Sequence, residues 1–124
     1  MTDAPPFDSP FARQFMCPAE HDTHTLAQAL APCLRAGDVV ALWGGLGAGK
    51  TSFARGLICA LAETSVEVPS PTYTLVQTYC LPRIEVWHFD LYRLASPQEV
   101  EEIGFEESQA GLALIEWPER AGLH

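Results

Sequence analysis

Apolar side chains first recur with the period of a helix in residues 26–34. They fall at positions i, i+3, i+4, i+7 and i+8, which is typical of an amphipathic helix. Asp22 or Thr23 is the expected N-cap, and Gly37 is the expected stop after the C-terminal end. Pro32 lies inside this pattern, so the helix is expected to kink or to end early.

Short apolar runs predict strands. Residues 39–43 are rich in β-branched and aromatic side chains, which favours a strand buried on both faces. Residues 73–80 and 84–89 are two strand-like runs joined by a three-residue turn, which predicts a hairpin. A fully apolar run over residues 112–115 predicts another strand, which ends on Glu116.

A phosphate-binding loop lies between the first strand and a second predicted helix, residues 50–62. Residues 44–51, GGLGAGKT, satisfy the pattern G-x-x-x-x-G-K-[ST]. Its glycines reach backbone angles that a Cβ would forbid, and so expose successive N–H groups to phosphate oxygens. Lys50, the only lysine of the chain, is predicted to neutralise the β and γ phosphates, and the Thr51 hydroxyl to join a magnesium shell. The order of strand, loop and helix predicts an α/β fold of the P-loop NTPase type, a three-layer sandwich with a small mixed sheet flanked by helices.

Such a loop needs a carboxylate at the end of a neighbouring strand, to hold the metal and orient the attacking nucleophile. Glu116 and Asp90 each follow a predicted strand, and both are candidates. Thr72 lies in the loop where nucleotide switches place a threonine that senses the γ-phosphate. His88 alternates with aromatic neighbours, so a packed strand histidine and a proton shuttle both fit its spacing.

The composition predicts one domain and a partner-dependent role. With 124 residues and 48% hydrophobic residues, the chain suits a single core over residues 21–124, after a loose arm at residues 1–20. The net charge of -9 argues against direct binding of nucleic acid. No apolar run approaches the about 20 residues of a membrane span, and the four cysteines lack a C-x-x-C pair, so a cytoplasmic protein is expected.

Acidic residues gather near the C-terminal third of the chain. Ser96, Pro97 and Glu99 form a capping box, which predicts the start of a short helix. The acidic residues in and after it are Glu99, Glu101, Glu102, Glu106 and Glu107. We expect them to form a solvated face, although five acids so close together could also meet a basic partner.

Four segments occur together in the order GLGAGKT, SPTYTLV, HFDLYRL and IEWPER. In this order and spacing, over about residues 23–120, they resemble the TsaE family. The resemblance implies a small ATPase that uses ATP and Mg²⁺ with low intrinsic turnover. It also implies a role with the TsaB and TsaD proteins in making threonylcarbamoyladenosine on tRNA, with tRNA engaged only indirectly.

The resemblance also implies roles for individual residues. Those implied to bind the triphosphate are Gly47, Ala48, Gly49, Lys50, Thr51 and Ser52. Thr51 and Glu116 are implied to serve Mg²⁺, and Thr72 and Asp90 to act as switch and water-orienting groups. Thr23 corresponds to a threonine near the nucleotide base.

The chain departs from the family pattern in three places. Gly45 stands where members usually carry Asp or Glu, and Ala27 replaces a usual glycine. The sequence stops at His124, where the family continues into further strands, so the sheet is expected to lack its C-terminal strands.

Two other functions fit the loop. One is a nucleotide-gated binding module without useful hydrolysis. The other is a P-loop kinase for a small molecule, against which stands the lack of an arginine-rich lid segment. The sequence does not choose between ATP and GTP on its own.

Overall fold

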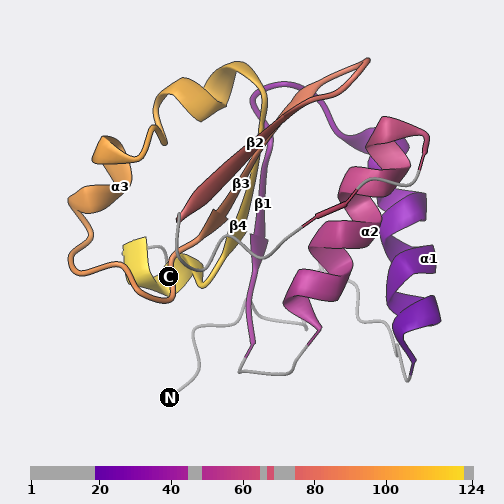
Figure 1. The fold of residues 1–124 in the computed structure, drawn as a ribbon, viewed down its shortest axis with the longest axis horizontal. Coiled ribbons are helices and arrows are strands. Elements are labelled where there is room, and N and C mark those ends of the chain that lie inside the picture. Colours follow the sequence, from indigo (N-terminus) through magenta and orange to yellow (C-terminus); the bar gives the residue numbers. More distant parts are fainter. Residues whose placement is uncertain (1–18, 45–48, 65–66, 69–74, 122–124) are drawn as a thin grey trace, which may run out of the picture.

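The predicted strands form one mixed sheet with helices packed on it (Figure 1). The computed structural model describes residues 19–44, 49–64, 67–68 and 75–121. The strands are β1 (Val39–Leu42), β2 (Val76–Cys80), β3 (Glu85–Asp90) and β4 (Leu112–Glu116), in the spatial order β1-β4-β3-β2. β4 runs parallel to both β1 and β3, whereas β2 pairs antiparallel with β3 as the predicted hairpin. The α/β fold class is therefore confirmed.

The most apolar strand lies inside the sheet. β4 is buried along its whole length, as expected for a parallel strand covered on both faces. The same expectation for residues 39–43 is wrong, because within the described residues β1 lies at one end of the strand order and Val39 is 47% exposed. Val40 and Leu42 pack on the helix-side core, but Val39 and Ala41 face the other way and belong to neither core cluster.

Two helices cover one face of the sheet. They are α1 (Glu20–Leu30), which continues into the 3₁₀ turn η1 (Ala31–Cys33), and α2 (Lys50–Ala62). α1 begins earlier than predicted, because Asp22 is not the N-cap but lies inside the first turn of the helix. Its carboxylate instead accepts a hydrogen bond of 3.1 Å from the backbone N–H of Ala19, the N-cap residue. Pro32 lies in η1, so the regular helix ends before the proline, as expected.

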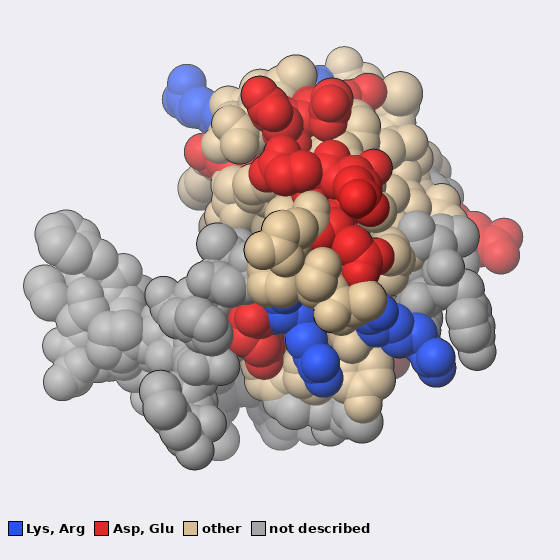
Figure 2. Space-filling model, turned by 90° about the vertical axis from the view of Figure 1, so that its left-hand side faces the viewer, with Lys and Arg blue, Asp and Glu red and all other residues tan. Residues whose placement is uncertain are grey.

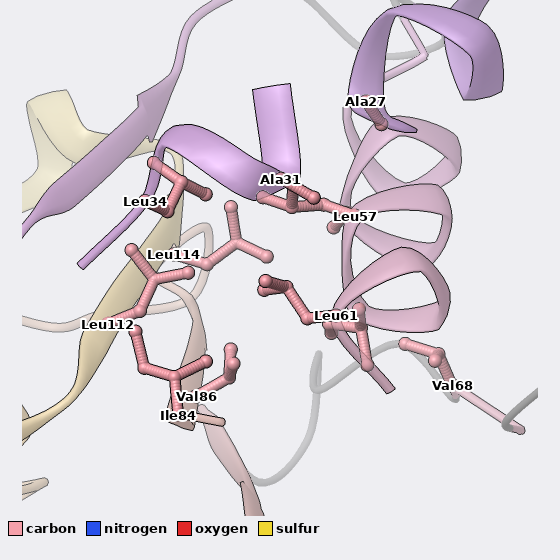
Figure 3. Close-up of a cluster of buried hydrophobic side chains, with 12 residues drawn as sticks. Ala27, Ala31, Leu34, Leu57, Leu61, Val68, Ile84, Val86, Leu112 and Leu114 are labelled. Atoms are coloured by element: carbon pink, nitrogen blue, oxygen red, sulfur yellow. The ribbon is translucent and has the colours of Figure 1, made fainter. Parts of the chain in front are cut away.

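The main core fills the space between these helices and the sheet (Figure 3). Leu57 and Leu61 of α2 lie against Val86 of β3 and against Leu112 and Leu114 of β4. Side chains alternate along a strand, so the even-numbered residues of β3 and β4 face the helices. The strand-end acids Asp90 and Glu116 belong to this same side.

A second, smaller cluster covers the opposite face. Phe89, Ala113 and Ile115 pack there with Leu91 and Leu94, beneath the segment that connects β3 to β4. That segment contains α3 (Glu99–Glu102) and the 3₁₀ turn η2 (Glu107–Ala110). The sheet therefore has packed layers on both faces, which agrees with the predicted three-layer arrangement.

Acidic side chains gather over the surface formed by α3 and η2 (Figure 2). Glu101, Glu102, Glu106 and Glu107 are exposed, so the predicted solvated face is present. Glu99 is half-buried and accepts a hydrogen bond of 3.1 Å from the backbone N–H of Ser96, one half of the predicted capping box. Among the helices of the described segments, none has the length and hydropathy to span a membrane.

Candidate functional site

The start of α2 meets the end of β4. The Thr51 hydroxyl donates a hydrogen bond of 2.9 Å to Oε1 of Glu116, although the two residues lie 65 positions apart in the sequence. Glu116 is only 2% exposed, because β4 is flanked by a strand on each side. The fold thus joins two side chains that the sequence predicts to serve one metal ion.

Lys50 lies beside the same carboxylate. Its ammonium donates to the carbonyl oxygen of Gly44 and lies 3.6 Å from the centroid of the Trp117 ring. Burial lowers the pKa of Lys50, and the nearby carboxylates of Glu116, Glu119 and Asp90 act against that shift. The lysine is therefore a desolvated cation placed next to acids, a setting that suits charge neutralisation.

The Trp117 ring that contacts Lys50 also packs against Tyr92, which in turn contacts Arg120. Trp117 has a positive φ of 59°, a conformation that bulky side chains rarely adopt, and it follows directly after Glu116. Its ring lies 4.8 Å from the ring of Tyr92, and the Arg120 guanidinium lies 5.4 Å from the centroid of that tyrosine. Cation–π contacts lie at both ends of this tilted aromatic pair, which is therefore held between Lys50 and Arg120.

Asp90 lies next to Glu116 across the sheet. The two residues are paired in the parallel register of β3 and β4, and Asp90 is 5% exposed. Its Oδ1 accepts a hydrogen bond of 3.1 Å from the backbone N–H of Tyr92. Both candidate acids therefore lie at the carboxyl ends of adjacent parallel strands, where open α/β sheets bind ligands.

His88 lies in the same group of side chains as Thr51, Asp90 and Glu116, and the sequence left its role open. The side chain is fully buried, and its Nε2 lies 2.7 Å from Oε2 of Glu116. The available signal was the strand period, which puts residues 86, 88 and 90 on the same side. That period could not show which residue of β4 the histidine would meet.

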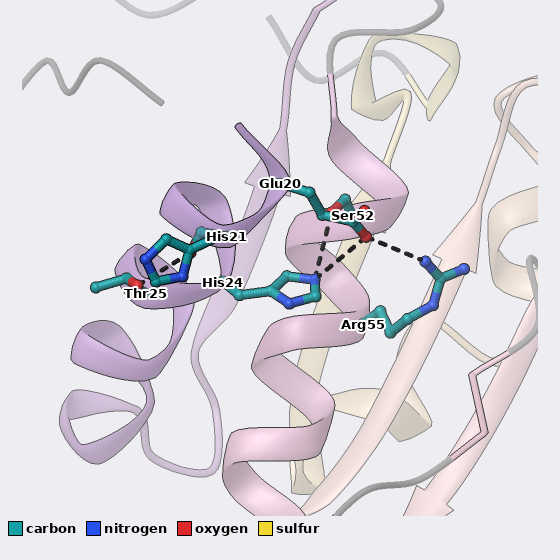
Figure 4. Close-up of polar contacts among 6 residues, drawn as sticks. All are labelled: Glu20, His21, His24, Thr25, Ser52 and Arg55. Atoms are coloured by element: carbon teal, nitrogen blue, oxygen red, sulfur yellow. Dashed lines mark hydrogen bonds and ion pairs between the residues drawn. The ribbon is translucent and has the colours of Figure 1, made fainter. Parts of the chain in front are cut away.

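The N-terminal half of α1 contacts the N-terminal half of α2 (Figure 4). Nε2 of His24 lies 3.3 Å from Oγ of Ser52 and 3.6 Å from a carboxylate oxygen of Glu20. The Arg55 guanidinium reaches the same Glu20 oxygen at 3.9 Å. Thr23 is half-buried and directly precedes His24, the residue that reaches Ser52 of α2.

Part of the predicted site falls outside the described residues. Gly47, Ala48 and Thr72 belong to that part, as does Gly45. Gly49 is described. It is the N-cap of α2 and has a φ of 87°, which explains why glycine suits the end of the loop.

The donor set fits Mg²⁺. The described side chains around Thr51 offer one hydroxyl and the carboxylates of Glu116 and Asp90, the hard oxygen ligands that Mg²⁺ prefers. Protein sites for this ion typically contribute only one or two carboxylates, and the substrate phosphates and water complete the shell.

Comparison with known proteins decides the family. Residues 17–124 match the family model described as "Threonylcarbamoyl adenosine biosynthesis protein TsaE". The chain belongs to the TsaE family. It is 47% identical over 102 residues to a tRNA threonylcarbamoyladenosine biosynthesis protein TsaE from Rickettsia conorii, which covers 82% of this chain and 58% of that protein. The TsaE protein of Aquifex aeolicus is 38% identical over 109 residues, covering 87% of this chain and 78% of the relative.

A solved structure supports the same fold. This TsaE family member superposes on the crystal structure of Bacillus subtilus YdiB with a TM-score of 0.68 and 27% sequence identity. The match covers 86% of this chain and 64% of YdiB. The chain thus spans about three fifths of the length of YdiB and of the Rickettsia conorii relative, at 64% and 58%.

Proposed function

We propose that this TsaE family member binds ATP with Mg²⁺ at the start of α2, hydrolyses it slowly alone, and acts with TsaB and TsaD. The hydrogen bond between Thr51 and Glu116 carries the proposal, because it joins the phosphate loop to a strand-end acid. The role in making threonylcarbamoyladenosine on tRNA is supported by the names of the relatives.

The site residues have distinct tasks in this proposal. The loop amides, from Gly47 to Gly49, hold the phosphates at the N-terminus of α2, and Lys50 neutralises charge on the transferring group. Thr51 and Glu116 hold Mg²⁺, which when bound offsets the negative charge of the phosphate oxygens.

Hydrolysis also needs an oriented water. Asp90 and Glu116 lie side by side at the strand ends, and we assign one of the two, Glu116 or Asp90, to orient the attacking water. Thr72 reports the nucleotide state, Ser52 contacts the phosphates, and Thr23 lies toward the base. Catalysis in this scheme consists of positioning and charge neutralisation.

The net charge of the chain supports an indirect role for tRNA. A chain with a net charge of -9 is poorly suited to hold tRNA by itself, so tRNA is engaged through the partner complex in the cytoplasm. The sequence placed the start of the folded domain at residue 21, but α1 begins at Glu20 and has Ala19 as its N-cap, so we assign these two residues to the domain as well.

Calorimetry tests binding. We expect Mg²⁺ and ATP to bind the unmodified chain, Lys50→Met to abolish binding, and the surface control Glu101→Gln to leave it unchanged. A parallel titration with GTP measures base selectivity. If the unmodified chain binds no nucleotide, the proposal is wrong for this chain.

Turnover measurements test hydrolysis. We expect slow release of phosphate by the chain alone, faster release with a TsaB and TsaD complex, and loss of both rates in Glu116→Gln. Nucleotide binding without phosphate release under either condition would indicate a binding module. Transfer of phosphate to a metabolite hydroxyl would indicate a kinase.

A further inference from the structure

Both oxygens of the Glu116 carboxylate are engaged within the described structure. Oε1 accepts from the Thr51 hydroxyl at 2.9 Å, and Oε2 lies 2.7 Å from Nε2 of His88. The histidine side chain is 0% exposed and the glutamate side chain 3% exposed. The second contact is therefore shielded from water, where a hydrogen bond to a carboxylate is strong.

The direction of this hydrogen bond follows from chemistry. An ionised carboxylate only accepts, so Nε2 of His88 is the donor to Glu116. Nδ1 of the same ring is buried and has no hydrogen-bond partner among the described residues. Within that part of the chain, the one polar contact of this ring is with Glu116.

The backbone fixes where the histidine stands. His88 lies in the middle of β3 and is paired with Leu114 in the parallel register. Leu114 lies two residues before Glu116, the acid that ends β4. β3 is flanked by β2 and β4, so the Cα of His88 has little freedom to move. In contrast, the terminal torsion of a glutamate is broad and does not by itself select one carboxylate orientation.

We infer that His88 is a positioning residue, which holds the Glu116 carboxylate so that Oε1 faces Thr51 and the metal side. The inference rests on the proposed function, since it assigns a support to the carboxylate that serves Mg²⁺. Residues that orient a metal-binding carboxylate typically change metal affinity or activity by about 10- to 100-fold when they are replaced.

Three substitutions separate the donor from the ring. His88→Met keeps the length and removes the donor. His88→Gln carries an amide nitrogen at about the reach of Nε2, whereas the shorter side chain of His88→Asn ends near the position of Nδ1. We expect about 10- to 100-fold weaker Mg²⁺ affinity in the Met and Asn variants, and recovery of most of the affinity in the Gln variant.

The primary readout is the affinity of the metal, not turnover. Mn²⁺ binding to the complex with a non-hydrolysable ATP analogue, followed by electron paramagnetic resonance, measures it directly. Nucleotide binding in EDTA should be nearly unchanged in all three variants, because the proposed action of His88 is on the carboxylate that serves the metal and not on the phosphates. The exposed His21→Gln serves as the matched control and should leave both affinities unchanged.

A double-mutant cycle with Glu116→Ala then tests the route of the effect. If His88 acts through Glu116, His88→Met lowers metal affinity in the unmodified chain and has no further effect in the Glu116→Ala background. Equal effects in both backgrounds would overturn the inference. Thermal melts accompany each variant, and if the Met variant does not fold, the comparison of Gln with Asn decides.

The outcomes also separate this inference from the proposed function. If the unmodified chain binds neither nucleotide nor Mn²⁺, the proposed function fails before His88 is tested. If it binds both, and the Met, Gln and Asn variants bind Mn²⁺ as well as the unmodified chain, only the positioning role of His88 is refuted.

Discussion

The close contact between α1 and α2 leads to a quantitative prediction for Gly56→Ala. A Cβ built on Gly56 would lie 2.9 Å from Cδ2 and 3.3 Å from Cα of His24. Alanine in place of glycine gains about 1 kcal/mol of helix propensity, whereas overpacking a close contact costs about 1–3 kcal/mol. We therefore expect a net loss of up to about 2 kcal/mol in the free energy of unfolding.

Removing the His24 ring should change the sign of the effect that Gly56→Ala has on the free energy of unfolding. In a His24→Ala background the two ring contacts, 2.9 Å to Cδ2 and 3.3 Å to Cγ, are gone, and the 3.3 Å contact to the backbone Cα remains. There, Gly56→Ala should be neutral or stabilise by up to about 1 kcal/mol. Urea denaturation of the four proteins of this cycle, followed by circular dichroism, measures the difference. An equal loss in both backgrounds would show that the approach of His24 is not the cause.

Three further changes test other parts of the fold and site. Arg83→Gln removes two guanidinium hydrogen bonds of 2.9 Å to backbone carbonyl groups at the end of the α1–η1 segment. This change should lower the free energy of unfolding by about 1–3 kcal/mol. The exposed Arg35→Gln serves as the control. Leu114→Ala empties a fully buried position between the helices and the sheet, and should cost about 2–5 kcal/mol in urea denaturation. Because the folded-state pKa of Lys50 is lowered from 10.5, the unfolded chain retains the proton over a pH range where the folded chain has lost it, so stability should rise with pH up to that value. Urea midpoints measured across that range should show the unmodified chain gaining stability relative to Lys50→Met, and a constant difference would contradict the shift.

Local patterns predicted much of the fold correctly. The helix over residues 50–62 has the bounds found in the structure, Lys50–Ala62, because the loop motif determines where it begins and an uninterrupted apolar stripe determines its length. The hairpin and the strand that ends on Glu116 were also predicted, since turn residues and apolar runs mark them locally. The start of α1 was placed too late, because Asp22 reaches back to cap the turn before it.

Predicting the surroundings of the site was harder. That Asp90 and Glu116 end neighbouring strands could be proposed from their positions, but their pairing depends on the register between β3 and β4. The placement of Lys50 against Trp117 depends on a positive φ at the tryptophan, which no local pattern indicated.

The sequence by itself determined the phosphate loop, the helix after it, the family and the two strand-end acids. These features depend on residue types at short, fixed spacings, where local backbone chemistry decides the outcome. Only the tertiary structure decided that β1 lies at one end of the described strand order, and that His88 lies within hydrogen-bond distance of Glu116. Both depend on which strands pair and in what register, and such long-range pairing is set by the packing of the whole core.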